Sequence, residues 1–337
     1  MDLTTRYMGL ELKNPLVASA SPLNADLGNI RHLEDSGAAA IVLPSIFEEQ
    51  IEAEMRHYAS LTTVGLESSP EAQSYFPESE EPGPQQYLDL IRRAVAAVDI
   101  PIIGSLNGTT DEGWIAYAKL IEEAGASGLE LNVYFIPTDL SLTGRDVEQR
   151  YLEILREVRK AIDIPVAIKL GPYFSSMGQI AMEFVGAGAN ALVLFNRFYQ
   201  PDIDLVELRL LNDLQLSGAS EMRLPLLWIA VLSGRIGASL AASTGVENSE
   251  QVLKYLLAGA DVVMTTSALL RNGPQYVEKL LTGTISWLSA RDIESVDQIR
   301  GLLSQRNFRN PDSFGRANYM KILQGYGTGN GEPEGRR

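Results

Sequence analysis

VAIKLGP, residues 166–172, has the composition of a buried β-strand and ends in one charged side chain, Lys169. Three other apolar runs have the same form: PIIGSLNG at 101–108, GLELNVY at 128–134 and ALVLFNR at 191–197, which end at Asn107, Asn132 and Asn196. Short apolar runs bounded by glycine or proline and spaced by helix-like segments are typical of buried parallel strands. Because the carboxyl ends of such strands share one edge, the pattern predicts a rim that carries three amides and one ammonium group.

Runs of this kind recur through the chain as a strand-plus-helix repeat of about 25 to 40 residues. Eight strands are predicted, at residues 16–20, 39–43, 101–106, 128–132, 165–170, 191–195, 239–243 and 261–265. Two helix-to-strand junctions even repeat the same tripeptide, Asp-Ile-Pro, at 99–101 and 163–165. Proline disfavours helix at the preceding residue and so ends the helix there. Eight such units favour a closed (β/α)8 barrel, the TIM-barrel α/β fold, over an open doubly wound sheet.

The barrel is predicted to occupy residues 1–290. An insertion rich in Pro, Ser and Glu follows the second strand at about 46–85, and its length suggests a lid or an interface. RLPLLWIAVLSGR, residues 223–235, fits either a buried strand or a helix that starts near Pro225, and its length favours the helix. Residues 291–337 are predicted to form a helical appendage with a disordered tail.

The composition limits the function. The chain has 337 residues, 28 basic and 43 acidic, with a net charge of -15. This charge argues against nucleic acid or an anionic membrane as partner, since both attract basic proteins. The chain has no cysteine, which excludes disulfides, thiolate metal sites and cysteine catalysis. His32 and His57, the two histidines, lie in charged helical contexts that favour surface positions. No apolar run is long enough for a membrane span, and a cytoplasmic protein is the simplest expectation.

Lys169 is the strongest single candidate for chemistry. The other lysines fall in loops or on helix faces, whereas Lys169 ends a strand rich in β-branched residues. A buried ammonium group needs an anionic or electron-rich partner, because its desolvation alone is prohibitively costly. The structural alternative is an ion pair with a strand-end carboxylate such as Glu130.

Small hydroxyl and glycine runs form a second constellation, at residues 217–220 (SGAS), 243–245 (STG) and 265–267 (TTS). The last two follow the seventh and eighth predicted strands, where barrels of this kind commonly bind phosphate. Turn formation is the alternative role for each run taken alone. A phosphate grip on one side and amides plus lysine across the rim fit flavin mononucleotide (FMN), a planar cofactor rich in hydrogen-bonding atoms.

From residue 14 to about 273 the sequence resembles the dihydroorotate dehydrogenase family. The resemblance rests on NPLVASAS at 14–21, LELN at 129–132, AIKLGPYF at 167–174, Asn196, STGVENSEQVLKYLLAGADVV at 243–263 and SALLRNGP at 267–274. It implies an FMN-dependent β/α barrel that oxidises dihydroorotate to orotate in pyrimidine biosynthesis. It also implies that Ala20 and Ser21 touch the flavin and that Asn132, Lys169 and Asn196 line its ring or the substrate. The resemblance assigns the cofactor phosphate to Ser220, Thr244, Gly245, Thr266 and Ser267.

Three departures separate the chain from that family. The family's catalytic base, a cysteine or a serine, follows the strand-four asparagine by a few residues, and Phe135 stands at that position here. Pro44 replaces the lysine after the second strand. The acidic segment LESSPEAQSYFPESEEPG, residues 66–83, replaces the substrate loop. Tyr134 is the nearest ionisable group and a candidate proton donor, with a packed aromatic ring as the alternative. Asp139, Ser141 and Thr143 are weaker candidates.

These observations predict an FMN-dependent oxidoreductase that acts on a C–C bond, with dihydroorotate as the default substrate and Lys169 and Tyr134 as catalytic residues. The alternatives are an ene-reductase or dihydropyrimidine type of activity, a flavin-binding protein without turnover, and a non-flavin aldolase that uses Lys169. A homodimer is the expectation that follows from the resemblance. An iron-sulfur partner subunit stays open, and no bound metal is predicted.

Overall fold

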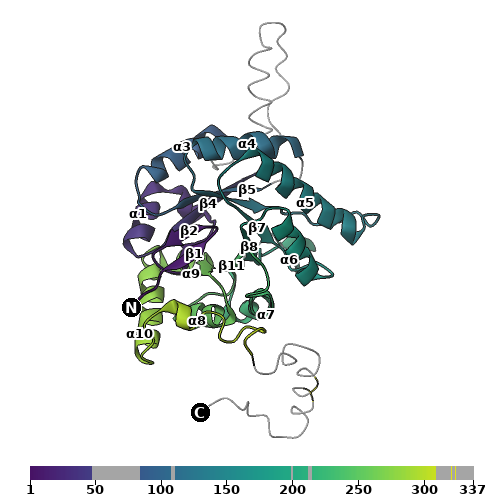
Figure 1. Ribbon diagram of the computed structural model, residues 1–337. Helices are drawn as coiled ribbons and strands as arrows, with labels where there is room; N and C mark the ends of the chain where they lie inside the picture. The colour runs from purple at the N-terminus through teal and green to yellow at the C-terminus, as the bar shows by residue number, and fades with distance from the viewer. Residues whose placement is uncertain are drawn as a thin grey trace.

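A closed barrel of eight parallel strands forms the centre of the molecule (Figure 1). The computed structural model describes residues 1–47, 84–107, 111–198, 200–211, 215–308, 320 and 323. In the order β11-β12-β3-β4-β5-β6-β7-β8, the barrel strands are Ser239–Ala242, Val262–Thr265, Leu16–Ala18, Ala40–Phe47, Ile102–Asn107, Gly128–Asn132, Val166–Leu170 and Ala191–Leu194. Each overlaps one of the eight predicted runs. The predicted (β/α)8 barrel is therefore confirmed.

Helices surround the barrel and bury the outward faces of its strands (Figure 1). They are α1 (Leu27–Asp35), α3 (Pro84–Val95), α4 (Asp111–Glu123), α5 (Gly144–Ala161), α6 (Met177–Gly186), α7 (Arg223–Leu232), α8 (Ser249–Ala258), the short α9 (Ser267–Asn272) and α10 (Tyr276–Ser289). Three short 3-10 helices accompany them: η1 (Pro22–Ala25), η2 (Ala219–Met222) and η3 (Val296–Gln298). Side-chain caps fix several helix starts. Thr143 and Asp146 form a reciprocal capping box at α5, and Asn248 caps α8.

The barrel interior holds its own apolar cluster, separate from the layer between strands and helices. The strand pleat turns alternate residues inward, so Ala167 of β7 belongs to the interior while Ile168 packs outward. A hairpin of β1 (Thr5–Tyr7) and β2 (Leu10–Leu12) closes the amino-terminal end. Its Tyr7 and Met8 join the interior cluster. Ligands can therefore reach the lumen from the opposite end, where the carboxyl termini of the strands lie.

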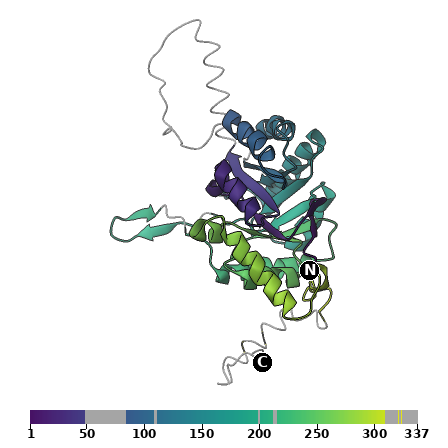
Figure 2. The same cartoon turned by 90° about the vertical axis from the view of Figure 1, so that its left-hand side faces the viewer.

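Some elements differ from the sequence-based expectations. Strand β4 continues beyond the predicted residue 43 to Phe47, and its register shifts between Val42 and Ser45, where Pro44 has no N–H to donate. Residues 223–232 form helix α7, as their length favoured. The hairpin of β9 (Asp202–Asp204) and β10 (Arg209–Leu211) was not predicted, and it projects from the barrel (Figure 2).

Two predicted segments are covered only in part. Of the predicted insertion, residues 48–83 lie outside the described residues, as does His57. Of the predicted appendage, residues 291–308 contain turns and η3, and most of the remainder lies outside the described part. His32 is exposed on α1, as expected. In the described part of the chain, no helix combines the length and the apolar character that a membrane crossing requires.

Candidate functional site

Side chains at the carboxyl ends of neighbouring strands form a hydrogen-bonded row. The register pairs Asn107 of β5 with Asn132 of β6, and Asn132 with Lys169 of β7. The amide of Asn196, just beyond β8, donates to Asn132 Oδ1 at 2.7 Å. Asn132 Nδ2 in turn donates to Ser45 Oγ at 3.5 Å. Hydrogen bonds therefore connect Asn196, Asn132 and Ser45, while Asn107 and Lys169 are placed beside Asn132 by the strand register.

Lys169 lies at the upper end of the barrel lumen and contacts a buried carboxylate. Its Nζ is 3.3 Å from Glu130 Oε1, and the two side chains are 9% and 1% exposed. Glu130 precedes Asn132 by one pleat step, so its side chain points into the same lumen. The ion pair that the sequence offered as a structural alternative is present. Lys169 nevertheless keeps its place in the wall of a cavity.

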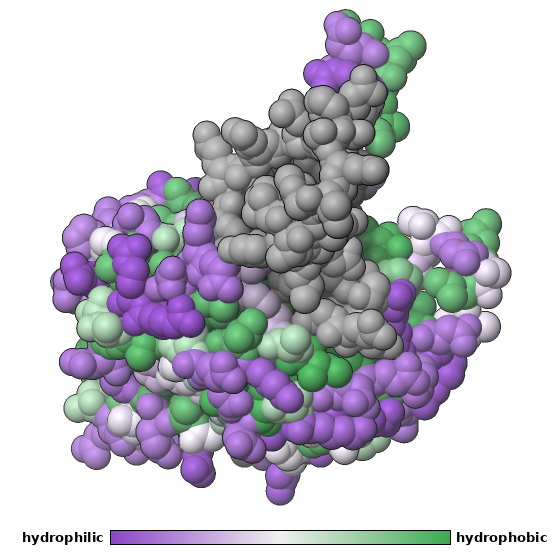
Figure 3. Space-filling view, turned by 90° about the horizontal axis from the view of Figure 1, so that it is seen from above, coloured by the Kyte–Doolittle hydropathy of each residue, from purple (hydrophilic) through white to green (hydrophobic). Residues whose placement is uncertain are grey.

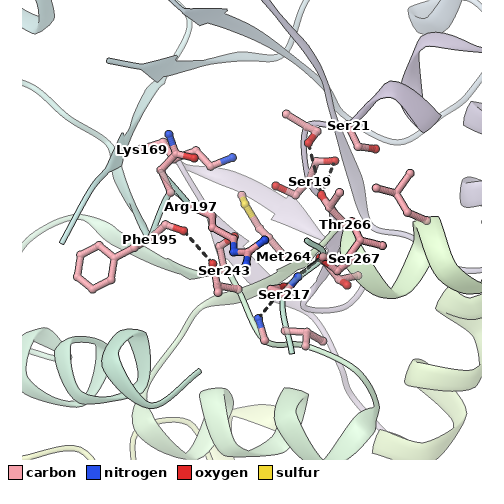
Figure 4. A pocket seen from close by; sticks show the side chains of 18 of the residues that line it. Ser19, Ser21, Lys169, Phe195, Arg197, Ser217, Ser243, Met264, Thr266 and Ser267 are labelled. Carbon is pink, nitrogen blue, oxygen red and sulfur yellow. Dashed lines mark hydrogen bonds between the residues drawn. The ribbon is translucent and has the colours of Figure 1, made fainter. Parts of the chain in front are cut away.

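This cavity has a volume of about 260 Å³ and lies over the ends of β3, β8, β11 and β12. We call it the hydroxyl cavity, because hydroxyl groups from separate loops converge on it (Figure 4). Its polar side chains are those of Ser19, Ser21, Lys169, Asn196, Arg197, Gln215, Ser217, Ser243, Thr244, Thr265, Thr266 and Ser267. Phe195, Met264 and Leu270 add apolar wall, which suits a ligand that is part phosphate and part ring.

Hydrogen bonds between loops hold the wall of the hydroxyl cavity in place. Ser217 Oγ lies 2.9 Å from Ser267 Oγ and accepts the Gly245 N–H at 3.3 Å. Arg271 of α9 donates to the carbonyl oxygen of Ser217 at 3.0 Å. Thr244 Oγ1 donates to the Phe195 carbonyl oxygen at 3.1 Å. These bonds connect the loops after β8, β11 and β12 into one preorganised surface.

The described residues that line the hydroxyl cavity include cationic side chains and no acidic ones, unlike the chain as a whole. The chain has 43 acidic residues, yet none of the described residues that line this cavity is acidic. Two cationic groups line it, Lys169 and Arg197, and Arg197 is paired with Glu221 at 3.0 Å. Thr244 and Gly245 both adopt positive φ, 81° and 75°, a turn geometry that often accompanies anion-binding backbone. The donor set therefore fits an anionic ligand such as a phosphate group.

Comparison with known proteins gives the family. The sequence model of dihydroorotate dehydrogenase matches residues 61–288, more than half of the chain. The chain belongs to this family. A putative dihydroorotate dehydrogenase A (fumarate) of Aeropyrum pernix is 25% identical over 89% of this chain and 97% of the relative. The catalytic subunit of dihydroorotate dehydrogenase B (NAD(+)) of Methanothermobacter thermautotrophicus is 24% identical over 89% and 98%. The NAD-dependent dihydropyrimidine dehydrogenase subunit PreA of Escherichia coli K12 is 22% identical over 89% and 76%.

Most residues predicted from the family resemblance come together. Eight of them line the hydroxyl cavity: Ala20, Ser21, Lys169, Asn196, Thr244, Gly245, Thr266 and Ser267. Asn107 and Asn132 are buried at the carboxyl ends of β5 and β6 and do not line the cavity. Ser220 does not line the cavity either. It lies in η2, which starts directly after Gly218 and leaves its side chain exposed, whereas Ser217 is buried and lines the cavity in its place.

Tyr134 and Phe135 belong to a different part of this dehydrogenase-family barrel. Tyr134 packs on Phe198 with ring centroids 4.6 Å apart and does not line the hydroxyl cavity. Phe135 lines a second cavity of about 350 Å³, which we call the aromatic cavity. The lining residues are Phe135, Ile136, Pro137, Val147, Tyr151, Gly171, Tyr173, Phe174 and Phe198. The position to which the sequence resemblance assigns the family's base thus holds an apolar ring that lines an aromatic cavity.

Several described residues at the site escaped the sequence reasoning. Ser45 and Ser105, 2.7 Å apart, extend the rim row onto β4 and β5. Ser19 and Arg197 line the hydroxyl cavity. Serine and arginine are common in turns and surface loops, so their sequence positions carried no distinguishing signal. Only the register of the strands could have shown that Ser45 faces Ser105.

Proposed function

We propose that this member of the dihydroorotate dehydrogenase family is an FMN-dependent oxidoreductase that acts on a C–C bond of a small substrate. The carboxylate-free, hydroxyl-rich cavity beside Lys169 carries the proposal, because it offers donors to a phosphate on one side and an ammonium group on the other. The dehydrogenase and dihydropyrimidine dehydrogenase relatives support the same reaction class. Dihydroorotate is the default substrate.

The proposed cofactor contacts come from this chain's fixed donors. Ser217, Thr244, Gly245, Thr266 and Ser267 would hold the phosphate, with Ser217 taking the place predicted for Ser220. Lys169 and Asn196 would border the ring, and Ala20 and Ser21 would close the opposite wall. FMN, when bound there, would supply hydride-transfer chemistry at a substrate carbon, and the chain would have to exchange a proton at the adjacent carbon. The ammonium of Lys169 would stabilise negative charge on the ring side of the site.

The reaction also needs a group that exchanges a proton with the substrate. The resemblance assigns this role in the family to a cysteine or a serine, and the chain has Phe135 at that position. Phenylalanine at residue 135 cannot accept a proton, and we propose Tyr134, its neighbour at the rim, as the exchanging group. Tyr134→Phe is expected to lower turnover about 100-fold, in the range typical of general acid-base groups. The measurement is kcat and KM for both proteins at one pH. A loss of this size in kcat with KM unchanged supports the assignment.

Tyr173→Phe is the matched control for that prediction, since Tyr173 also packs on Phe198, with centroids 5.7 Å apart, and is 69% exposed. Its turnover is expected to stay within about twofold of wild type, because the change keeps the ring that lines the aromatic cavity. Equal losses in the two variants would mean that the aromatic wall alone matters. That result would remove Tyr134 from the catalytic residues.

A second candidate function keeps FMN but changes the substrate, to an activated alkene or a dihydropyrimidine. The aromatic cavity favours it, because no charged side chain is among its lining residues in the described part of the chain, and a carboxylate-bearing substrate needs cationic contacts. The deciding experiment offers the FMN-loaded protein dihydroorotate, a dihydropyrimidine and an enone in turn, under anaerobic conditions. Flavin turnover with dihydroorotate supports the first candidate, and turnover with one of the others supports the second. Turnover with none contradicts both and leaves a flavin-binding protein.

We also propose that the protein is a homodimer that uses the β9–β10 hairpin as part of its interface. The hairpin projects clear of the barrel (Figure 2), and an arm that leaves the body in Figure 3 carries apolar side chains beside polar ones. Leu205, Val206 and Leu208 are 83%, 87% and 83% exposed. Isolated two-stranded hairpins are marginally stable, and exposed apolar patches of this kind mark association sites.

The double variant Leu205→Lys/Val206→Lys is therefore expected to shift the dimer to monomer, with an affinity loss of at least about tenfold from the lost apolar burial. Light scattering after size-exclusion chromatography measures the mass of the wild-type protein and of the double variant. Leu302→Lys is the control, because Leu302 is a half-exposed leucine outside the hairpin. This variant should have the same mass as the wild-type protein. A wild-type monomer at micromolar concentration contradicts the homodimer and favours a partner subunit of the kind named for the relatives.

A further inference from the structure

Glu130 lies in the barrel lumen below Lys169, where most of the surrounding side chains are small or apolar. Its backbone register partner on β7 is Ala167, and the interior cluster also includes Val193 and Met264. The residue is fully buried, and its Oε2 atom has no hydrogen-bond partner among the described residues. Burial raises the pKa of Tyr7, below it in the lumen, well above its usual range, and the nearby carboxylate of Glu130 raises that pKa further.

Fold stability does not explain a carboxylate at this position. A buried ion pair loses the hydration of both ions, and apolar side chains of similar volume are often as stable or more stable in its place. Ser105, the register partner of Glu130 on β5, is already bonded to Ser45. The ionic contact of Glu130 is with Lys169, at 3.3 Å, and Lys169 is at the same time part of the hydroxyl cavity wall.

We propose that Glu130 is a positioning residue for Lys169. The carboxylate holds the ammonium group at the cavity wall and offsets its charge, and it thereby limits how strongly the site prefers the more negatively charged, reduced form of the ligand. This inference rests on the proposed function, because it takes FMN as that ligand. Glu130 does not line the hydroxyl cavity, so its whole effect passes through Lys169.

Glu130→Gln tests the proposal, since it removes the charge and keeps the shape. The FMN-loaded variant is expected to bind reduced FMN about tenfold more tightly relative to oxidised FMN, which for a two-electron couple is a potential shift of ~30 mV in the positive direction. Lys169→Met is expected to shift the potential in the negative direction. In the double variant Glu130→Gln/Lys169→Met, the potential should equal that of Lys169→Met, because the group through which Glu130 acts is gone.

Two results would overturn the proposal: no shift in Glu130→Gln, or the same shift whether residue 169 is lysine or methionine. Glu130→Asp, which keeps the charge, should restore most of the wild-type potential, whereas a requirement for shape alone would leave it displaced. The same variants are unfolded with urea in the absence of FMN, where coupling predicts a double variant less destabilised than the sum of the single ones. A protein that binds no FMN overturns the proposed function, and the urea cycle then still decides the Glu130–Lys169 coupling.

Discussion

Lys169→Met is expected to lower the rate of substrate-dependent flavin reduction about 100-fold or more, the range seen when one charge-stabilising group is removed from an active site. The side chain of Lys169 reaches the wall of the hydroxyl cavity from the barrel lumen and brings an ammonium group there. In the described part of the chain, no other lysine lines that cavity. Methionine keeps the length and apolar stem but removes the charge. The effect is measured by stopped-flow absorbance, at a saturating concentration of whichever substrate reduces the flavin in the anaerobic comparison proposed above.

Folding has to be separated from chemistry in this variant. Removing one partner of a buried ion pair costs about 3–5 kcal/mol, because the other charge is left uncompensated. The double variant Glu130→Gln/Lys169→Met avoids that cost and is expected to show the same kinetic loss. Lys254→Met is the control, since Lys254 is exposed and paired with Glu250 on α8. The loss of one such group predicts a much larger fall in rate than about fivefold. If the double variant is stable and reduces flavin within about fivefold of the wild-type rate, the assignment of Lys169 is contradicted.

Gly245→Ala is expected to cause the second large loss, in FMN binding. Gly245 has φ 75°, where an alanine costs about 1–2 kcal/mol. A Cβ atom at this residue would lie 2.8 Å from the backbone nitrogen of Met222 and 3.1 Å from the carbonyl oxygen of Gly218. Backbone atoms cannot rotate away, so the turn that carries Thr244 and the bond to Ser217 must move. FMN affinity, measured by fluorescence quenching, should fall at least about tenfold, which corresponds to 1.4 kcal/mol.

Gly237→Ala provides the matched control, because a Cβ there meets no atom within 4 Å and the residue does not require positive φ. Its FMN affinity should equal that of wild type. If Gly245→Ala binds FMN as tightly as Gly237→Ala does, the turn after β11 is not part of the cofactor site. The phosphate would then have to be held elsewhere.

The barrel could be predicted from the sequence because its strands are nearly continuous apolar runs with clear boundaries. The end of β4 could not, since Pro44 argues against a strand and the register shift that accommodates it depends on the neighbouring β5. The β9–β10 hairpin was missed for another reason. DIDLVELRLL, residues 202–211, has apolar residues that the structure leaves exposed, a pattern that resembles a core segment when it is read alone.

The site was predictable where a residue stood at a strand end. Asn132, Lys169 and Asn196 follow directly from the strand pattern, and the structure joins the first and third by a hydrogen bond. The sequence did not show which serine of a loop faces the cavity. Ser217 precedes η2 and lines the cavity, whereas Ser220 lies within η2 and does not. The contact between Glu130 and Lys169 depends on the pleat and on register, which the sequence suggested only as an alternative.

The central claim is that the hydroxyl cavity holds FMN, and the visible absorption spectrum of the purified full-length chain tests it most directly. We expect a flavin spectrum near one FMN per chain, either as isolated or after incubation with FMN and removal of the excess. Gly245→Ala, treated in the same way, should retain much less. A colourless wild-type protein that takes up no FMN would contradict the account.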